Sequence, residues 1–326
     1  MAVAASVETL VQAAGAHVPT LMHALEHRLS ELSGGHGRLL ARHAGDTIAA
    51  GGKRLRPLLV FIVAGDLPSE PVNLVRAAVA VELIHSATLV HDDVLDAAQL
   101  RRGRPTVVAT AGRAIASATG DLLFSRAFAE LARNRRPDEV RVLSDASSAL
   151  VQGELLQRAD AFEPGVTVRR YLRRCELKTA CLFEAACRLG ALEAPAPQPP
   201  ERELGRFGRA IGLAFQLLDD VLDVSGPAER TGKARGTDLL DGTVTLPLIL
   251  ARARDPELAD LDLRRVATPD DAERVCQRIE GSGALDEARR RALEIVADAK
   301  ASLPDLPTRQ RATLELVADG VVERYA

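Results

Sequence analysis

The stretch Leu89-Val-His-Asp-Asp-Val-Leu-Asp96 returns in the second half of the chain as Leu217-Leu-Asp-Asp-Val-Leu-Asp223. In a helix, the outer aspartates of each Asp-Asp-x-x-Asp pattern lie four residues apart and share one face. Like charges at this spacing destabilise a helix, and placing them among leucine and valine costs more unless cations occupy the site. Two copies in apolar settings therefore predict two helices that present carboxylates to one cavity from opposite sides.

The rest of the chain has the composition of a helical protein. Of its 326 residues 47% are hydrophobic and 3% aromatic, and Trp is absent. Apolar residues recur at helical spacing, for instance at Leu10, Ala14, Leu21 and Leu25, whereas alternating strand patterns are scarce. The proline-rich stretch from Ala194 to Pro200 is short enough for a surface loop within one domain. We predict an all-α fold in a single domain spanning residues 1–326.

The charge, apolar pattern and cysteine spacing argue against nucleic-acid binding, a membrane span and a zinc or redox site. A formal net charge of −3 provides no overall basic field for nucleic acid. No segment approaches about 18 uninterrupted apolar residues, and the start lacks a signal-peptide pattern, so we expect no membrane span and a cytoplasmic protein. The cysteine spacing fits no zinc or redox pattern, so the simplest interpretation is four reduced, packed thiols.

Basic residues gather beside both aspartate patterns. Carboxylate clusters suit Mg²⁺, which keeps several waters and is usually shared with substrate phosphates, and arginine forks match phosphate oxygens. A Walker loop is missing, which disfavours nucleotide triphosphate chemistry of that type. The basic stretches are Gly51-Gly-Lys-Arg-Leu-Arg-Pro57, Arg101-Arg-Gly-Arg104, Lys178-Thr179 and Thr231-Gly-Lys-Ala-Arg-Gly236.

These motifs resemble those of the trans-isoprenyl diphosphate synthases, the polyprenyl synthetase family, and the resemblance is strongest over residues 45–250. The ordered set is the Gly51–Pro57 turn, the first aspartate motif with Arg101-Arg102, Gly120-Asp121, Gln152-Gly153-Glu154, Lys178-Thr179, and the second motif beginning at Phe215-Gln216. The resemblance implies an isoprenoid-synthase-type bundle of long helices around a central cavity, commonly a homodimer. It also implies head-to-tail condensation of isopentenyl diphosphate with an allylic diphosphate.

By the same resemblance, three Mg²⁺ ions would be held by Asp92, Asp96 and Asp219, with Asp93, Asp220 and Asp223 in support. The allylic diphosphate would contact Arg101, Lys178, Gln216 and Lys233, with Thr179 facing the allylic cation. Isopentenyl diphosphate would bind Lys53, Arg56, His85 and Arg102; a core histidine is the alternative for His85. The chain departs from many relatives at Ala97 and Gln99, and at Thr243, where a lysine is common, so one diphosphate contact is in doubt.

Product length depends on the residues one turn before Asp92. Thr88 and Ala87 are small, and Ile84 lies further along the same wall, with Phe124 or Phe128 as a candidate floor or as ordinary core. In the family, bulky aromatics at these positions stop elongation early. The resemblance therefore implies geranylgeranyl diphosphate or a longer product.

Three alternatives remain open at this stage. A farnesyl diphosphate synthase would use the same chemistry with a shorter product. A class I terpene cyclase would carry a different second metal motif and would not need an isopentenyl site. A non-catalytic subunit of a heteromeric synthase would be free to lose metal ligands, yet all six aspartates are present.

Overall fold

The computed structural model describes residues 7–33, 38–49, 52–66, 70–101, 103–195, 197, 199–226 and 235–323. Nearly all of its secondary structure is helical, which confirms the all-α prediction. The α-helices are α1 (Val7–Ala14), α2 (Val18–Ser33), α3 (Arg38–Ala49), α4 (Leu55–Ala64), α5 (Pro71–Leu95), α6 (Val107–Ala132), α7 (Pro137–Asp160), α8 (Val168–Cys175), α9 (Cys181–Glu193), α10 (Glu201–Ser225), α12 (Thr237–Leu240), α13 (Leu246–Arg252), α14 (Pro256–Ala259), α15 (Pro269–Gly281), α16 (Ala284–Ala301) and α17 (Thr308–Glu323). A π-helix, η1 (Glu176–Ala180), and a 3₁₀ turn, η2 (Leu263–Arg265), complete the helical elements.

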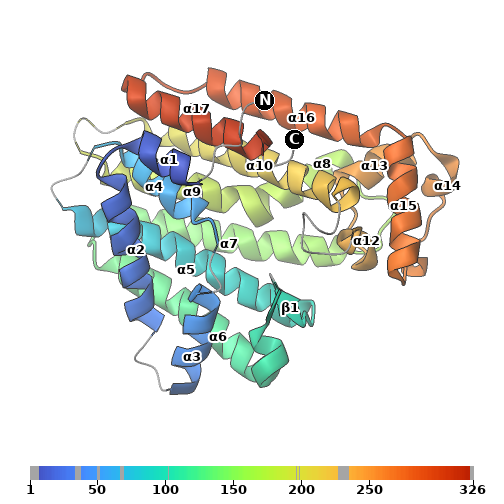
Figure 1. Ribbon diagram of the computed structural model, residues 1–326, viewed down its shortest axis with the longest axis horizontal. Helices are drawn as coiled ribbons and strands as arrows, with labels where there is room; N and C mark the ends of the chain where they lie inside the picture. The colour runs from blue at the N-terminus through green and yellow to red at the C-terminus, as the bar shows by residue number, and fades with distance from the viewer. Residues whose placement is uncertain are drawn as a thin grey trace.

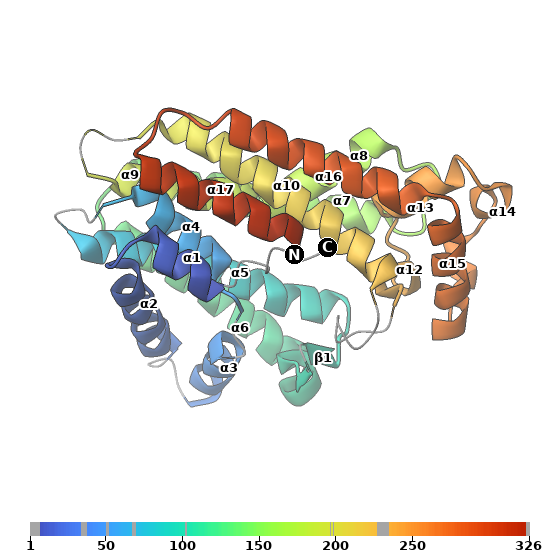
Figure 2. The ribbon, with the colours of Figure 1, turned by 45° about the horizontal axis from the view of Figure 1, so that its top comes forward.

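The long helices lie side by side, and α15 crosses them at one end (Figures 1 and 2). The most extensive contacts join α5 to α6, and α10 to α9 and α16. Helix α9 also packs on α4, α5 and α7, so it lies at the centre of the bundle. The two aspartate-bearing helices, α5 and α10, therefore flank a shared central layer.

The first aspartate motif lies at the C-terminal end of α5. The helix starts with Pro71, whose missing N–H is harmless in the first turn, and its last turn is closed by Asp96 N–H donating to the Asp92 carbonyl at 2.8 Å. A two-stranded hairpin follows, formed by β1 (Leu100–Arg101) and β2 (Arg104–Pro105). The hairpin returns Arg101 to the motif.

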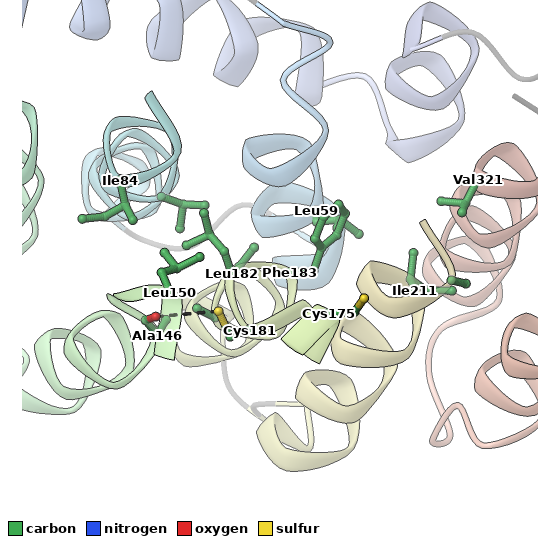
Figure 3. Close-up of a cluster of buried hydrophobic side chains, with 14 of the residues drawn as sticks. Leu59, Ile84, Ala146, Leu150, Cys175, Cys181, Leu182, Phe183, Ile211 and Val321 are labelled. Atoms are coloured by element: carbon green, nitrogen blue, oxygen red, sulfur yellow. Dashed lines mark hydrogen bonds between the residues drawn. The ribbon is translucent and has the colours of Figure 1, made fainter. Parts of the chain in front are cut away.

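The core between α5, α7, α9 and α10 is apolar and closely packed (Figure 3). Ile84 of α5, Phe183 of α9 and Ile211 of α10 belong to one cluster of buried side chains. Cys181 donates its thiol hydrogen to the Leu177 carbonyl at 2.8 Å. All four cysteines are buried and form no disulfide, in agreement with the sequence prediction.

Helix α5 is long and apolar enough to cross a membrane by length and composition alone, and no other described helix is. However, 72% of its most apolar window is buried inside the protein. Its hydrophobicity is therefore accounted for by packing against neighbouring helices.

A pair of acidic side chains is enclosed where α7 begins and α9 ends. The Glu139 carboxylate is fully buried, accepts a hydrogen bond from Asn134 Nδ2 at 2.9 Å, and is hydrogen-bonded to Glu193. Burial, followed by the hydrogen bond to Glu193, raises the pKa of Glu139 to about 9. Arg136 lies 3.3 Å from Glu193. At neutral pH the Glu139 carboxyl group therefore keeps its proton.

Replacing Glu139 by glutamine is expected to stabilise the protein increasingly as pH rises. The Glu139 pKa is raised above its unfolded value, so the wild type loses stability between that value and pH 9, whereas glutamine has no proton to lose. The gain in the free energy of unfolding should be about 2 kcal/mol larger at pH 7 than at pH 5. Urea denaturation at both pH values measures it, with Asp138→Asn at the exposed neighbouring position as the control. An equal effect of Glu139→Gln at both pH values would contradict the raised pKa of Glu139.

Candidate active site

The three aspartates of the first motif differ in exposure. Asp93 is buried at 6% exposure, Asp96 is exposed at the end of α5, and Asp92 lies between these extremes. Burial raises the pKa of Asp92 to about 6, opposed by the positive charges of Lys178 and Arg101 and reinforced by the negative charge of Glu154. Asp92 is thus a partly desolvated carboxylate in a ring of charges.

Arg101 binds the inner aspartate of this motif. Its Nε donates to Asp93 Oδ1 at 2.7 Å, because the hairpin after α5 folds back on the helix. Asp93 is turned away from Asp92 by about a quarter of the helix circumference. This ion pair fixes the hairpin arginine beside the motif.

Lys178 and Glu154 join η1 to α7. Lys178 Nζ donates to Glu154 Oε2, and Arg158, one turn further along α7, donates to Glu154 Oε1 at 2.8 Å and to Asp96 Oδ1. Desolvation opposes ionisation of Glu154, but these two cations outweigh it and lower its pKa. Three separate segments therefore meet at the first motif through charged side chains.

Gly153 explains how α7 approaches η1 so closely. A Cβ atom added at this residue would lie 2.5 Å from the backbone nitrogen of Lys178. Only glycine fits at that separation without moving one of the two backbones. The glycine of the Gln-Gly-Glu motif therefore lets Glu154 reach Lys178.

The Lys178-Thr179 pair lies in the π-helix η1, a widened turn of a kind often found at functional sites. Thr179 Oγ1 donates to Gln216 Oε1 at 2.6 Å, and Gln216 Nε2 donates to Asp220 Oδ1 at 2.7 Å. Asp220 also accepts from the hydroxyl of the fully buried Tyr171 at 2.6 Å. Thus η1 is linked to both motifs: the Lys178 charge acts on Asp92, and Thr179 is joined to Asp220 through Gln216.

The second motif repeats the graded exposure of the first. Asp219 is exposed, and Asp220 is buried at 4% exposure. Burial, together with the negative charges of Asp238 and Asp219, raises the pKa of Asp220 to about 8. Asp223 accepts from the Asp238 backbone N–H at 3.2 Å through Oδ2. One outward carboxylate and one buried, hydrogen-bonded carboxylate therefore occur in each motif.

The predicted isopentenyl diphosphate ligands differ in their surroundings. His85 lines a cavity of about 670 Å³ between α3, α5 and the start of α6, together with Asp93 and Arg101. Arg56 instead lies 4.4 Å from the ring centroid of Phe183, and Lys53 is exposed. Arg102, and the allylic diphosphate candidate Lys233, lie outside the described residues.

Arg54, the remaining cation of the glycine-rich turn, binds carboxylates inside the protein. It is 9% exposed and donates to Glu82 at 2.7 Å and to Glu26 at 2.7 Å. Its backbone has a φ of 49°, unusual for a residue with a Cβ. The side chain therefore holds the turn against α2 and α5.

The carboxylates suit a hard divalent cation that is completed by a ligand. Within the described ranges, no three His, Cys, Asp or Glu side chains are grouped closely enough to hold an ion alone. Mg²⁺ is commonly bound by one or two carboxylates plus water and substrate phosphates. The exposed Asp96 and Asp219 and the partly buried Asp92 have the donor chemistry for that arrangement.

The candidate chain-length residues lie directly before the first motif. Ala87 and Ile84 are fully buried, and Thr88 is half-buried with its hydroxyl donating to the His85 carbonyl at 2.8 Å. Phe124 stacks on His91 with ring centroids 5.7 Å apart. Phe124 and Phe128 both pack against the core.

Sequence reasoning set aside or missed three residues that contact the candidate site. Glu154 was recognised in its motif but given no role, and Arg158 and Tyr171 were not considered. Glu154 and Arg158 are four apart on α7, a pairing signal that was available from sequence. Their contacts with Asp96 and Lys178 join distant segments, and no local pattern predicts them.

The position of Thr243 is also clear. Its backbone N–H donates to the Asp238 carbonyl at 2.8 Å, and the preceding carbonyl, of Gly242, accepts from Phe162 N–H at 2.8 Å. Thr243 therefore lies in the segment that follows α12, close to the second motif. The lysine charge common in relatives is absent there.

The chain is similar to known proteins over most of its length. The polyprenyl synthetase family model matches residues 38–279. Heptaprenyl diphosphate synthase component 2 of Geobacillus stearothermophilus is 45% identical over 63% of this chain and 64% of its own length. Geranylgeranyl diphosphate synthase of Methanosarcina mazei is 36% identical over 85% of this chain and 87% of its own length.

A solved structure is similar over the full length. The polyprenyl synthase of Caulobacter crescentus, crystallised with calcium and isoprenyl diphosphate, superposes with a TM-score of 0.91 at 36% identity, covering 100% of both chains. The order of motifs, the helical bundle and the paired aspartate helices agree with this match. The chain belongs to the polyprenyl synthetase family of prenyltransferases.

Proposed function

We propose that this protein condenses isopentenyl diphosphate with an allylic diphosphate and releases diphosphate. One observation carries the proposal: in the short segment η1, Lys178 donates to Glu154 and its charge acts on Asp92 of the first motif, while Thr179 donates to Gln216 beside the second motif. A site that gathers cations next to carboxylates fits a diphosphate bound together with divalent metal.

In this reaction the allylic C–O bond breaks and its electron pair leaves with the diphosphate. Lys178 and Arg101 would stabilise that growing negative charge, which is usually the largest catalytic contribution. Gln216 would orient the diphosphate, and the Thr179 oxygen would face the allylic cation. The double bond of isopentenyl diphosphate then forms the new C–C bond, and the released diphosphate accepts the departing proton.

Asp92, Asp96 and Asp219 are the proposed metal ligands, with Asp93, Asp220 and Asp223 in support. Three Mg²⁺ ions bound there would neutralise charge on the leaving group. The buried Asp93 and Asp220 are already hydrogen-bonded to protein groups, which suits a supporting role. The calcium-bound relative from Caulobacter supports a divalent metal at this site.

Isopentenyl diphosphate would bind Lys53, Arg56, His85 and Arg102. His85 supports this proposal best, because it lines the cavity beside the first motif. Lys233 would join the allylic diphosphate contacts.

We further propose one domain spanning residues 1–326, because a single core cluster includes both Leu10 and Val321. A homodimer and a cytoplasmic location remain predictions from the family resemblance and the sequence. The exposed Val151 and Leu155 of α7 are available for a dimer contact.

The function is tested by incubating purified protein with Mg²⁺, labelled isopentenyl diphosphate and each of dimethylallyl, geranyl, farnesyl and geranylgeranyl diphosphates. Mass-resolved products should be elongated diphosphates of geranylgeranyl length or longer. Folded protein that incorporates no label with any primer would overturn the proposal.

Replacing Thr88 by phenylalanine is expected to shorten the product. Thr88 is half-buried one turn before Asp92, so a ring there can project along the proposed path of the prenyl tail, whereas a ring at the fully buried Ala87 would overpack the core. Product mass measures the change, with Thr88→Ser as the control. An unchanged product length at normal activity would show that Thr88 does not line the path.

A further inference from the structure

Arg158 occupies a position between two carboxylates at the rim of the site. It lies in the last turn of α7 and donates through its terminal nitrogen to Asp96 Oδ1 and through Nε to Glu154 Oε1 at 2.8 Å. Arg158 is 40% exposed and Asp96 is 38% exposed, so both side chains are free to move into the solvent-facing part of the site. Their positions in the chain are far apart, so the contact depends on the fold.

The contact completes a set of cations that faces the first motif. Asp93 is bound by Arg101 at 2.7 Å, and Asp92 experiences the charges of Lys178 and Arg101. Asp96, a proposed metal ligand, is bound by Arg158. The Arg158 guanidinium is therefore hydrogen-bonded to a carboxylate oxygen of Asp96 that a metal ion would need as a ligand.

We propose that Arg158 neutralises Asp96 in the ligand-free protein and moves to the substrate diphosphate when a metal ion takes its place. This inference rests on the proposed function. Two cations compete for one carboxylate, and a divalent ion on Asp96 repels the guanidinium. Glu154 keeps Nε of Arg158 at the rim, so the freed terminal nitrogens remain near the site and match phosphate oxygens. Arg158 is thus a positioning residue for metal and diphosphate.

A purely structural role fits the contact less well. An exposed ion pair of this kind contributes little to stability. Glu154 retains Lys178 as a second partner without Arg158. The Arg158→Gln variant should therefore fold normally, which allows its binding properties to be measured.

The test uses two binding measurements that should change in opposite directions. For Mn²⁺ alone, followed by the electron paramagnetic resonance signal of the free ion, Arg158→Gln should bind about threefold more tightly than wild type, because the competing cation is gone. For inorganic diphosphate in saturating Mg²⁺, followed by calorimetry, it should bind about tenfold more weakly, because a charged contact is lost.

Two further variants sharpen the test. Arg141→Gln, on the same helix and paired with the exposed Asp138, should change neither constant. Arg158→Lys keeps the charge but loses the bidentate fork, so it should recover part of the diphosphate affinity.

Weaker binding of both ligands by Arg158→Gln, or no change in either, would overturn the proposal. Tighter Mn²⁺ binding with unchanged diphosphate affinity would show that the Arg158 side chain does not move to the diphosphate, which would overturn that part of the proposal. Neither binding measurement requires turnover. A wild-type protein that fails to elongate any primer would therefore overturn the proposed function without deciding the binding results for Arg158, so the two failures can be told apart.

Discussion

Replacing Asp92 by asparagine is expected to lower the rate of chain elongation by about 1,000-fold or more. Asparagine keeps the size of the side chain but removes the negative charge at the centre of the charged ring around the first motif. A neutral amide is a much poorer ligand for Mg²⁺, so the leaving diphosphate would lose part of its charge stabilisation. Steady-state kinetics with an allylic primer measures the loss.

The control for this variant is Asp286→Asn, an exposed aspartate on α16. Both variants should melt within a few degrees of the wild type, since Asp92 contributes to binding more than to packing. An Asp92→Asn protein with near-normal elongation would contradict the assignment of Asp92 as a metal ligand.

Replacing Arg54 by methionine is expected to cost about 3–5 kcal/mol in the free energy of unfolding. The change leaves Glu82, itself only 4% exposed, as a buried carboxylate without its arginine partner. Burial already raises the pKa of Glu82, and Arg54 opposes that shift most strongly, with a smaller contribution from Arg56. Urea denaturation measures the cost.

Two comparisons identify the cause. Lys53→Met, at the exposed neighbouring position, should change stability by less than about 0.5 kcal/mol, since surface substitutions rarely cost more. The double variant Arg54→Met with Glu82→Met should recover much of the loss, because no unpaired buried charge remains. A single variant as stable as the wild type would show that the buried pair is not required.

The sequence predicted the helical fold because apolar spacing is a local property of the chain. It also placed Asp92 and Asp96 on one face, since four-residue spacing fixes that geometry in any helix. Gly153 belongs to the Gln152-Gly153-Glu154 motif, but glycine is required there because the backbone comes close to Lys178 on another helix. Contacts of that kind depend on packing.

Other features were beyond reach of local patterns. Nothing in the Gly51–Pro57 turn distinguishes the buried Arg54 from its exposed neighbour Lys53, because both are basic residues in a polar stretch. The π-helix at Glu176–Ala180 has no composition signal, and it packs against both α7 and α10. The roles of individual side chains remain predictions.

The most direct test of the central claim compares the diphosphate released with the isopentenyl diphosphate consumed in one reaction containing Mg²⁺ and geranyl diphosphate. Head-to-tail elongation predicts equal amounts and products longer than the primer by whole isoprene units. Release without consumption would indicate a terpene cyclase. Folded protein that does neither would contradict a catalytic role and favour a non-catalytic subunit of a heteromeric synthase.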